Sequence, residues 1–146
     1  MPGTNPIPVL YDKKTIDFLK GCKDKDLLIA AISSSPLLLA KAGLLSGKKY
    51  TAGIFQEMFE LFDFLEKDNY IIWPVVEDGN IITALGMFYQ EFAQQVLDRL
   101  GYDYKDDFTI CPRQSFEEKD YIWNLSEEGL IRIKQEIFDI ENQDKH

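Results

Sequence analysis

The order of apolar and polar positions predicts strands and helices that alternate along the chain. Residues 26–32 form a short apolar run typical of a strand buried on both faces, and Pro36 follows at a place suited to the first turn of a helix. Residues 37–45 continue that helix, and Gly43 and Gly47 favour its end. The pattern therefore predicts a strand, a sharp turn and a helix that packs back on the strand.

One helix is predicted before this unit and two after it. Asp12 is placed to cap the first helix, residues 88–100 form the second with Gly101 as its stop, and Ser126 is placed to cap the third. The positions expected to face inward are apolar: Ile16, Phe18 and Leu19 in the first helix, Phe92, Val96, Leu97 and Leu100 in the second, and Leu130, Ile133, Ile137 and Ile140 in the third.

A hairpin is predicted between the helix that begins at Pro36 and the helix of residues 88–100. Residues 70–76 and 80–85 are rich in aromatic and branched side chains, and Asp78-Gly79 between them is a two-residue turn signal. Strands that alternate with helices are typical of an α/β fold. We therefore expect an α/β sandwich in which residues 26–32 form the central parallel strand, with helices on both sides.

The composition narrows the class of protein. At 146 residues and 45% apolar content, the chain fits one globular domain. Its net charge of -9 argues against a nucleic-acid-binding surface. No segment reaches the roughly 20 apolar residues that cross a bilayer, and residues 1–3 do not begin a secretory signal. We expect a cytoplasmic protein that binds neither nucleic acid nor membranes.

The two cysteines, Cys22 and Cys111, do not form a metal-binding pattern. There is no CxxC motif, and the single histidine, His146, is the last residue. We therefore expect no metal and no cofactor. In a cytosolic chain both thiols are expected to be reduced, and Cys22, in a predicted loop, is the more accessible of the two.

Residues 26–50 resemble the nucleophile elbow of the ThiJ/PfpI superfamily, which includes the Parkinsonism-associated deglycase and class I glutamine amidotransferase-like proteins. The family pattern is an apolar strand, Ala-Ile-Cys, small residues, Pro, a Leu-rich helix and then Ala-Gly-Leu-Leu and Gly-Lys-Lys. The matching positions are Ala31, Ile32, Pro36, Ala42, Gly43, Leu44, Leu45, Gly47, Lys48 and Lys49. Residues 75–83 and 91–101 resemble the late strand-turn-strand and the closing helix of the family. The resemblance implies a flavodoxin-like three-layer sandwich with a mainly parallel central sheet.

The sequence departs from the family pattern at the positions of the family's functional residues. The family cysteine falls on Ser33, and Ser34 and Ser35 follow it. A cysteine is partly ionised at neutral pH, whereas a serine hydroxyl needs a neighbouring base. The positions that carry the family histidine hold other residues here, and of the family's Ser-Arg-Pro-Gly motif only Gly86 remains. The elbow is therefore expected to be degenerate.

The resemblance also implies an N-terminally truncated version of the family fold. Residues 1–5 resemble the Pro-Gly-Gly turn that normally lies well inside that fold. We expect residues 1–101 to form the C-terminal portion of the family domain, and residues 102–146 to be an extension whose final helix packs on the same domain or contacts a partner. A homo-oligomer, or a partner that supplies the missing strands, is expected in either case.

Three functional hypotheses follow. The favoured one is a non-catalytic domain that binds a small anionic ligand or a protein partner. Unsatisfied N–H groups at the start of the Pro36 helix and the hydroxyls of Ser33, Ser34 and Ser35 would bind the ligand. The aromatic stripe in residues 51–69 is interpreted as a packing face, although by analogy with the family Phe55, Phe59 or Phe62 would form one wall of a small pocket, with Phe55 as the chosen ligand-binding residue.

The other two hypotheses are enzymatic. In one, Ser33 is a catalytic nucleophile assisted by groups that the sequence does not reveal. In the other, the chain is a deglycase- or glyoxalase-type or amidase- or peptidase-type hydrolase of the family in truncated or Cys-to-Ser form.

Overall fold

The structure is a computed structural model that describes residues 5–103 and 115–143. The helices are α1 (Ile7–Leu10), α2 (Lys13–Lys20), α3 (Pro36–Lys41), α4 (Met58–Leu61), α5 (Tyr89–Arg99) and α6 (Glu127–Gln143), with 3-10 turns η1 (Lys67–Asn69), η2 (Gly86–Phe88) and η3 (Glu118–Tyr121). The strands are β1 (Ile29–Ile32), β2 (Val75–Asp78) and β3 (Ile81–Ala84). Cys111, in residues 104–114, and His146, in residues 144–146, lie outside the described ranges.

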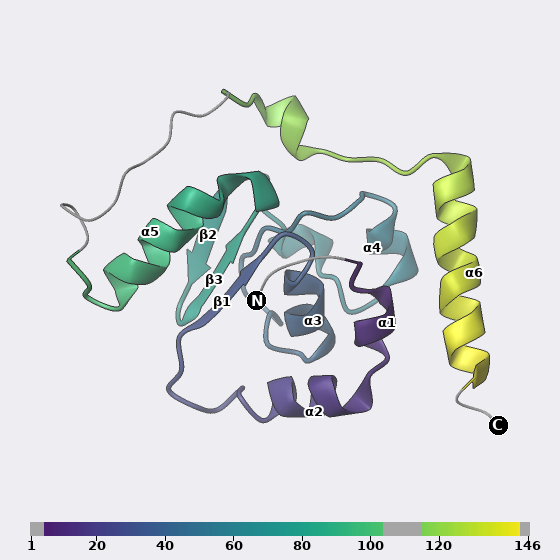
Figure 1. Ribbon diagram of the computed structural model, residues 1–146, viewed down its shortest axis with the longest axis horizontal. Coiled ribbons are helices and arrows are strands. Elements are labelled where there is room, and N and C mark those ends of the chain that lie inside the picture. The colour runs from purple at the N-terminus through teal and green to yellow at the C-terminus, as the bar shows by residue number, and fades with distance from the viewer. Residues whose placement is uncertain (1–4, 104–114, 144–146) are drawn as a thin grey trace.

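The three strands form one sheet in the order β1-β3-β2 (Figure 1). β1 runs parallel to β3, from the pair Ile29–Ile81 to the pair Ile32–Ala84, and β2 runs antiparallel to β3. All four residues of β3 are buried. The central strand is therefore β3, and the expectation that residues 26–32 form it was wrong. An apolar run indicates that a strand is buried, but it does not indicate how many strands flank it.

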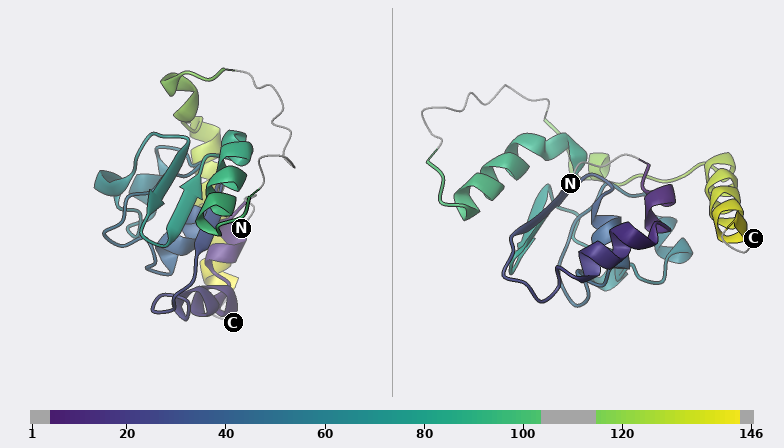
Figure 2. Two further views of the ribbon diagram at one scale, coloured as in Figure 1. Left: turned by 90° about the vertical axis from the view of Figure 1, so that its left-hand side faces the viewer. Right: turned by 60° about the horizontal axis from the view of Figure 1, so that its bottom comes forward.

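Helices cover the sheet on two sides, which confirms the α/β class. Figures 1 and 2 show α5 on one side of the sheet, and α3 with α1 and α2 on the other. α3 packs on β1 directly after the turn that joins them. Its residues Leu37, Leu38 and Leu39 are all buried, so the predicted strand-turn-helix unit forms the centre of the core. The helix ends at Lys41, several residues earlier than predicted.

The first predicted helix forms, with one correction. The carboxylate of Asp12 accepts a hydrogen bond from the Thr15 N–H at 3.0 Å, as expected of an N-cap. Ile16 and Leu19 are buried, but the Phe18 side chain is 71% exposed. Phe18 was expected to face the core. It lies two residues from Ile16, which places it on the other side of the helix.

The loop that follows α2 corrects the expectation for Cys22. The Cys22 side chain is only 8% exposed, and its thiol donates a hydrogen bond to the Phe18 carbonyl at 3.4 Å. The thiol is therefore buried beside the end of α2 rather than accessible.

The predicted hairpin and the predicted helix α5 both form, but the position of the turn and the exposure of Leu100 differ from the prediction. The turn is Gly79-Asn80, one residue later than predicted, and Gly79 has the left-handed φ of +64°. α5 ends at Arg99, and Gly101 at φ +68° follows as the expected stop. Leu100 was expected to face inward, but it lies beyond the helix end and is 65% exposed.

The aromatic segment between β1 and β2 is mostly not helical. Its helical spacing is realised only in the single turn of α4, after which the chain bends toward η1. Met58, Phe62 and Leu65 are nevertheless buried, which confirms the interpretation of the stripe as a packing face. Phe55 differs from them because it lies at the edge of the core, with 36% of its surface exposed.

The final helix packs along α1 at one end of the molecule (Figure 1). Ser126 caps it by accepting a hydrogen bond from the Gly129 N–H at 3.1 Å. Ile133, Ile137 and Ile140 pack against the core. The Tyr11 hydroxyl donates to Glu141 at 3.2 Å, and burial, followed by the nearby Glu141 carboxylate, raises the pKa of Tyr11 to about 12. The domain boundary near residue 101 stays a prediction.

Within the described ranges, none of the helices has the length and apolar character required to cross a membrane.

Candidate functional site

The turn between β1 and α3 is held in a strained conformation. Ser33 has φ +63°, the only left-handed backbone of a non-glycine residue in residues 5–103 and 115–143. Its N–H donates to the Ala84 carbonyl at 2.9 Å, and its own carbonyl accepts from the Gly53 N–H at 2.7 Å. A left-handed backbone costs a non-glycine residue about 1–2 kcal/mol, so these flanking contacts must hold the turn in place.

Ser35 has a structural place in the same turn. It is 2% exposed, and its hydroxyl donates to the Ile32 carbonyl at 2.7 Å and accepts from the Ile32 N–H at 3.0 Å. The Ser35 hydroxyl thus satisfies both backbone groups of the last residue of β1. This explains why a small hydroxyl residue fits the position without contact with a ligand.

The backbone N–H groups at the start of α3 are engaged. Ser33 donates to Ala84, Ser35 donates to Ile32 at 3.3 Å, and Leu37 and Leu38 donate to carbonyls of the turn at 3.1 and 3.0 Å. The expectation of unsatisfied donors at these positions was therefore wrong. The turn is so tight that its own carbonyls reach the donors of the first helical turn.

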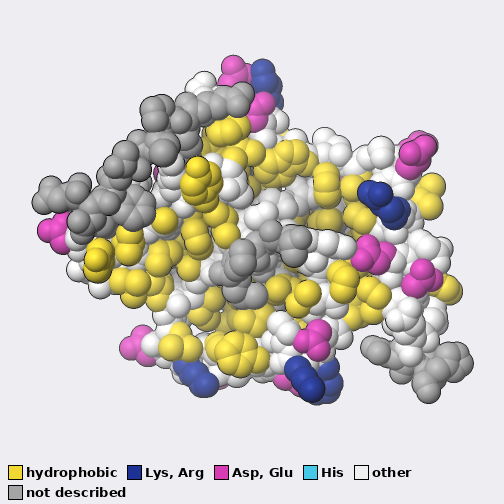
Figure 3. Space-filling view, viewed as in Figure 1, with side chains coloured by type: hydrophobic (Ala, Val, Ile, Leu, Met, Phe, Trp, Pro, Cys, Tyr) yellow, Lys and Arg dark blue, Asp and Glu magenta, His cyan; other side chains and the backbone are white. Residues whose placement is uncertain are grey.

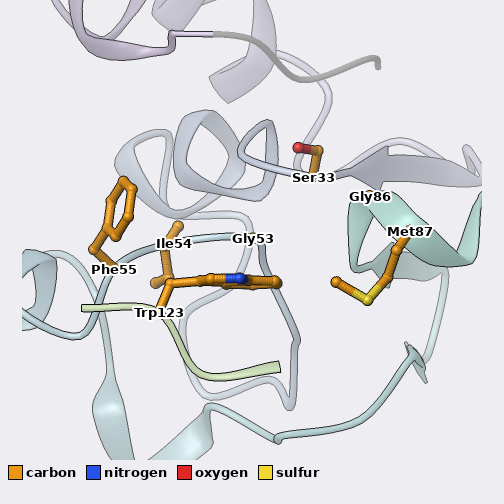
Figure 4. Close-up of a pocket in the computed structure, with 7 residues that line it drawn as sticks. All are labelled: Ser33, Gly53, Ile54, Phe55, Gly86, Met87 and Trp123. Atoms are coloured by element: carbon orange, nitrogen blue, oxygen red, sulfur yellow. The ribbon is translucent and has the colours of Figure 1, made fainter. Parts of the chain in front are cut away.

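A pocket of about 280 Å³ opens beside Ser33 (Figure 4). The residues that line it are Ser33, Gly53, Ile54, Phe55, Gly86, Met87 and Trp123. None of these side chains is charged. The Ser33 hydroxyl makes no hydrogen bond with any residue that the structure describes, so it is available to a ligand.

Two glycines allow the chain to pass close to the elbow. A Cβ on Gly86 would lie 3.2 Å from both Cβ and Oγ of Ser33, and a Cβ on Gly53 would lie 3.3 Å from the Ser33 carbonyl carbon. Larger residues at either position would press on the turn. The lack of side chains at Gly86 and Gly53 therefore allows both segments to pack directly against Ser33.

The pocket brings together two of the residues predicted from the sequence and leaves out two others. Ser33 and Phe55 line it, whereas Ser34 and Ser35 do not. Sequence reasoning missed Trp123, which comes from the segment before α6. An apolar triplet at residues 121–123, within a charged stretch, was the one signal that could have pointed to it.

The comparison with protein families agrees with this geometry. Residues 1–99 match the DJ-1/PfpI family. The chain belongs to this family. The match ends before Trp123, so that wall of the pocket comes from a segment outside the matched residues.

Two curated proteins are similar to part of this chain. The chain is 28% identical over 92 residues to a Bacillus subtilis protein named uncharacterized protease YdeA, and these cover 63% of this chain and 47% of that protein. It is 39% identical over 87 residues to the uncharacterized protein MJ0967 of Methanocaldococcus jannaschii, with 58% and 41% covered. The chain thus spans less than half the length of these curated relatives.

A solved structure shows the same fold. The DJ-1/ThiJ/PfpI-like and ferritin-like two-domain protein of Anabaena variabilis superposes with a TM-score of 0.58 and 27% sequence identity. The superposition covers 74% of this chain and 32% of that one. The flavodoxin-like expectation for the fold is therefore confirmed.

Proposed function

We propose that this DJ-1/PfpI-family domain binds a small ligand in the pocket beside Ser33 and does not catalyse a covalent reaction. The observation that carries the proposal is that Ser33 lines the pocket, while its hydroxyl makes no hydrogen bond to a base among the described residues. A serine becomes a nucleophile only when a neighbouring group removes its proton. The hydroxyl can still donate one hydrogen bond to a ligand and accept another.

The anionic ligand expected from the sequence has weaker support than an uncharged one. No charged side chain lines the pocket, and the donors at the start of α3 are already engaged. A carboxylate or phosphate would therefore lose its water without gaining a paired charge, which is costly. The chain as a whole is also acidic, with a net charge of -9. We therefore favour an uncharged small molecule.

The enzymatic alternative retains one specific observation in its favour. Strained backbone clusters at functional sites, and Ser33 has a positive φ at the turn between a strand and a helix, as the nucleophile elbow does. A hydrolase or deglycase in Cys-to-Ser form would have this geometry. It would also need a base near Ser33 Oγ.

Activity assays distinguish the ligand-binding proposal from the enzymatic alternative. The purified chain should show no turnover of methylglyoxal or of peptide substrates above the rate of Ser33→Ala. Ser33→Cys is the matched variant, because a thiol of similar size is partly ionised without a base. Turnover that Ser33→Ala abolishes would contradict the proposal. Turnover that appears only in Ser33→Cys would show that the site lost its activity through the Cys-to-Ser change.

Two further parts of the proposal rest on the sequence. The cytoplasmic location expected from the sequence stays a prediction. The family resemblance supports a homo-oligomer, or a protein partner that extends the sheet beside β1, which stands at one end of the strand order.

A further inference from the structure

The segment of residues 116–125, here called the strap, is attached to one rim of the pocket through aromatic rings. The rings of Phe116 and Tyr121 meet the ring of Phe88 edge to face, with centroids 5.6 and 5.4 Å apart. Phe88 directly follows Gly86 and Met87, which line the pocket. Edge-to-face pairs of this kind add to the stability of an aromatic contact. The first part of the strap is therefore fixed beside the Gly86 rim.

The second part of the strap is attached to the opposite rim through hydrogen bonds. The Gln56 N–H donates to the Trp123 carbonyl at 2.9 Å, and the Leu125 N–H donates to the Glu57 carboxylate at 2.9 Å. Phe55 and Trp123 also form a parallel bridge. These contacts fix the backbone on both sides of Trp123. The strap thus joins the two rims and holds the indole in the pocket.

The Trp123 indole presents a flat face to the cavity. Figure 4 shows the ring across the pocket from Ser33, with the Met87 side chain extending toward it from the other side. A flat indole face stacks favourably on another aromatic ring, and a thioether packs well at a ring edge. The lining therefore favours a planar molecule over a bulky aliphatic one.

The volume and polarity of the pocket restrict the ligand further. A dry apolar cavity of about 150 Å³ holds benzene, so the 280 Å³ here accommodate one ring with a short substituent. The hydroxyl of Ser33 and the indole N–H of Trp123 are the polar side-chain groups in the lining, and neither carries a charge. A single uncharged polar substituent would satisfy the Ser33 hydroxyl.

We propose that the pocket binds a small uncharged aromatic molecule with a hydroxyl or carbonyl substituent. Its ring stacks on Trp123, its substituent hydrogen-bonds Ser33 Oγ, and Trp123 determines this specificity. The inference rests on the proposed function, because it places the ligand in the same pocket and names its chemical class.

Titration of the ¹⁵N-labelled full chain with three matched probes tests the ligand class. Benzyl alcohol has the ring and the hydroxyl, cyclohexylmethanol has the hydroxyl without the aromatic face, and benzoate has the ring with a charge. We expect benzyl alcohol to shift the Trp123 indole signal and the amide signals of Ser33 and Gly86 in a saturable manner. Cyclohexylmethanol and benzoate should bind at least several-fold more weakly.

Variants of the two tryptophans test the role of the strap residue. Trp123→Ala should weaken benzyl alcohol binding about tenfold, and Trp123→Phe, which keeps an aromatic face, should restore it to within about threefold. Trp73→Phe is the control, because Trp73 is 62% exposed and does not line the pocket. Trp73→Phe should leave the affinity for benzyl alcohol unchanged. Because it removes one of the two indole signals, it also shows which signal belongs to Trp123. The Trp123→Phe variant also guards against loss of binding through unfolding.

The outcomes distinguish this inference from the proposed function. Equal affinity for all three probes, or unchanged affinity in Trp123→Ala, would overturn the inference and leave a ligand site at Ser33. No shift with any of the probes would overturn both the aromatic specificity and the ligand-binding role. Turnover that depends on Ser33 would overturn the non-catalytic role, whereas the Trp123 result would decide the specificity independently.

Discussion

Gly86 lies directly against Ser33, so that a methyl group on Gly86 would be 3.2 Å from both Cβ and Oγ of the serine. This is closer than ordinary van der Waals contact between carbon atoms. A side chain at residue 86 would therefore require Ser33 to move by a few tenths of an ångström. The parallel pairing of β1 with β3 brings the two positions together.

Gly86→Ala should destabilise the protein by about 1–3 kcal/mol, because the added methyl group overpacks the elbow. Urea unfolding of the full chain measures the change. Gly129→Ala in α6 is the comparison variant: its new methyl group would lie 3.3 Å from Leu125 Cδ2 and from Ser126 Oγ, but alanine is favoured over glycine inside a helix, which offsets the crowding. A Gly86→Ala variant as stable as Gly129→Ala would show that the elbow moves freely.

Ser33→Gly should be more stable than Ser33→Ala by about 1 kcal/mol. Glycine adopts the φ of +63° without steric cost, whereas alanine keeps the strain and loses only a hydroxyl that bonds no described residue. Chemical denaturation of the two variants in the same buffer gives the difference directly. If the alanine variant proves equal or more stable, the backbone at this position is not strained.

Acid should destabilise the protein partly through Glu66. Its carboxylate accepts from the Gly47 N–H at 2.9 Å, from the Ser46 hydroxyl at 3.0 Å and from the Asn69 amide, and the Gly47 bond is the main cause that lowers its pKa. A pKa lower in the folded than in the unfolded state gives stability that is present above the unfolded value. That stability is lost as the pH falls through the folded value.

We therefore expect Glu66→Gln to lose less stability than the wild type between about pH 5 and pH 3. The measurement is the free energy of unfolding by urea at several pH values. Glu60→Gln is the control, because Glu60 is exposed and its side chain bonds no described residue. Parallel curves for wild type and Glu66→Gln would contradict the prediction.

Docking of α6 should depend on its inward face. Ile137→Ala removes apolar contacts with the core and should destabilise the protein by about 1–2 kcal/mol, less than a fully buried site because Ile137 is half-buried. Ile131→Ala on the same helix is the control. Ile131 is 67% exposed, so its truncation should change the stability by less than about 0.5 kcal/mol.

Self-association is a further prediction. Figure 3 shows apolar side chains across the face that carries α5, and on α6 the large side chains of Ile131 and Phe138 are 67% and 61% exposed. Exposed apolar surface of this extent favours contact with another chain. Light scattering across a dilution series should reveal a dimer or larger assembly, which Ile131→Glu/Phe138→Glu weakens if α6 takes part. A folded monomer at micromolar concentration would contradict the prediction.

The sequence by itself determined the local units of this protein. The run before Ser33, the proline at the first turn of α3 and the caps Asp12 and Ser126 act within a few residues of one another. The hydrophobic period, the helix caps and the turn residues each depend on residues that are close in the sequence. They can therefore be recognised from the sequence alone. The family motif belongs to the same class, because the elbow is a continuous stretch of chain.

Tertiary structure alone decided which side chains meet. Phe18 and Phe55 belong to apolar patterns yet reach the surface, and β1 has the composition of a central strand yet stands at the end of the order. Trp123 enters the pocket because backbone hydrogen bonds tie it to Gln56 and ring contacts tie the strap to Phe88. Such long-range contacts depend on how separate segments pack against one another. The spacing of residues within one segment does not predict them.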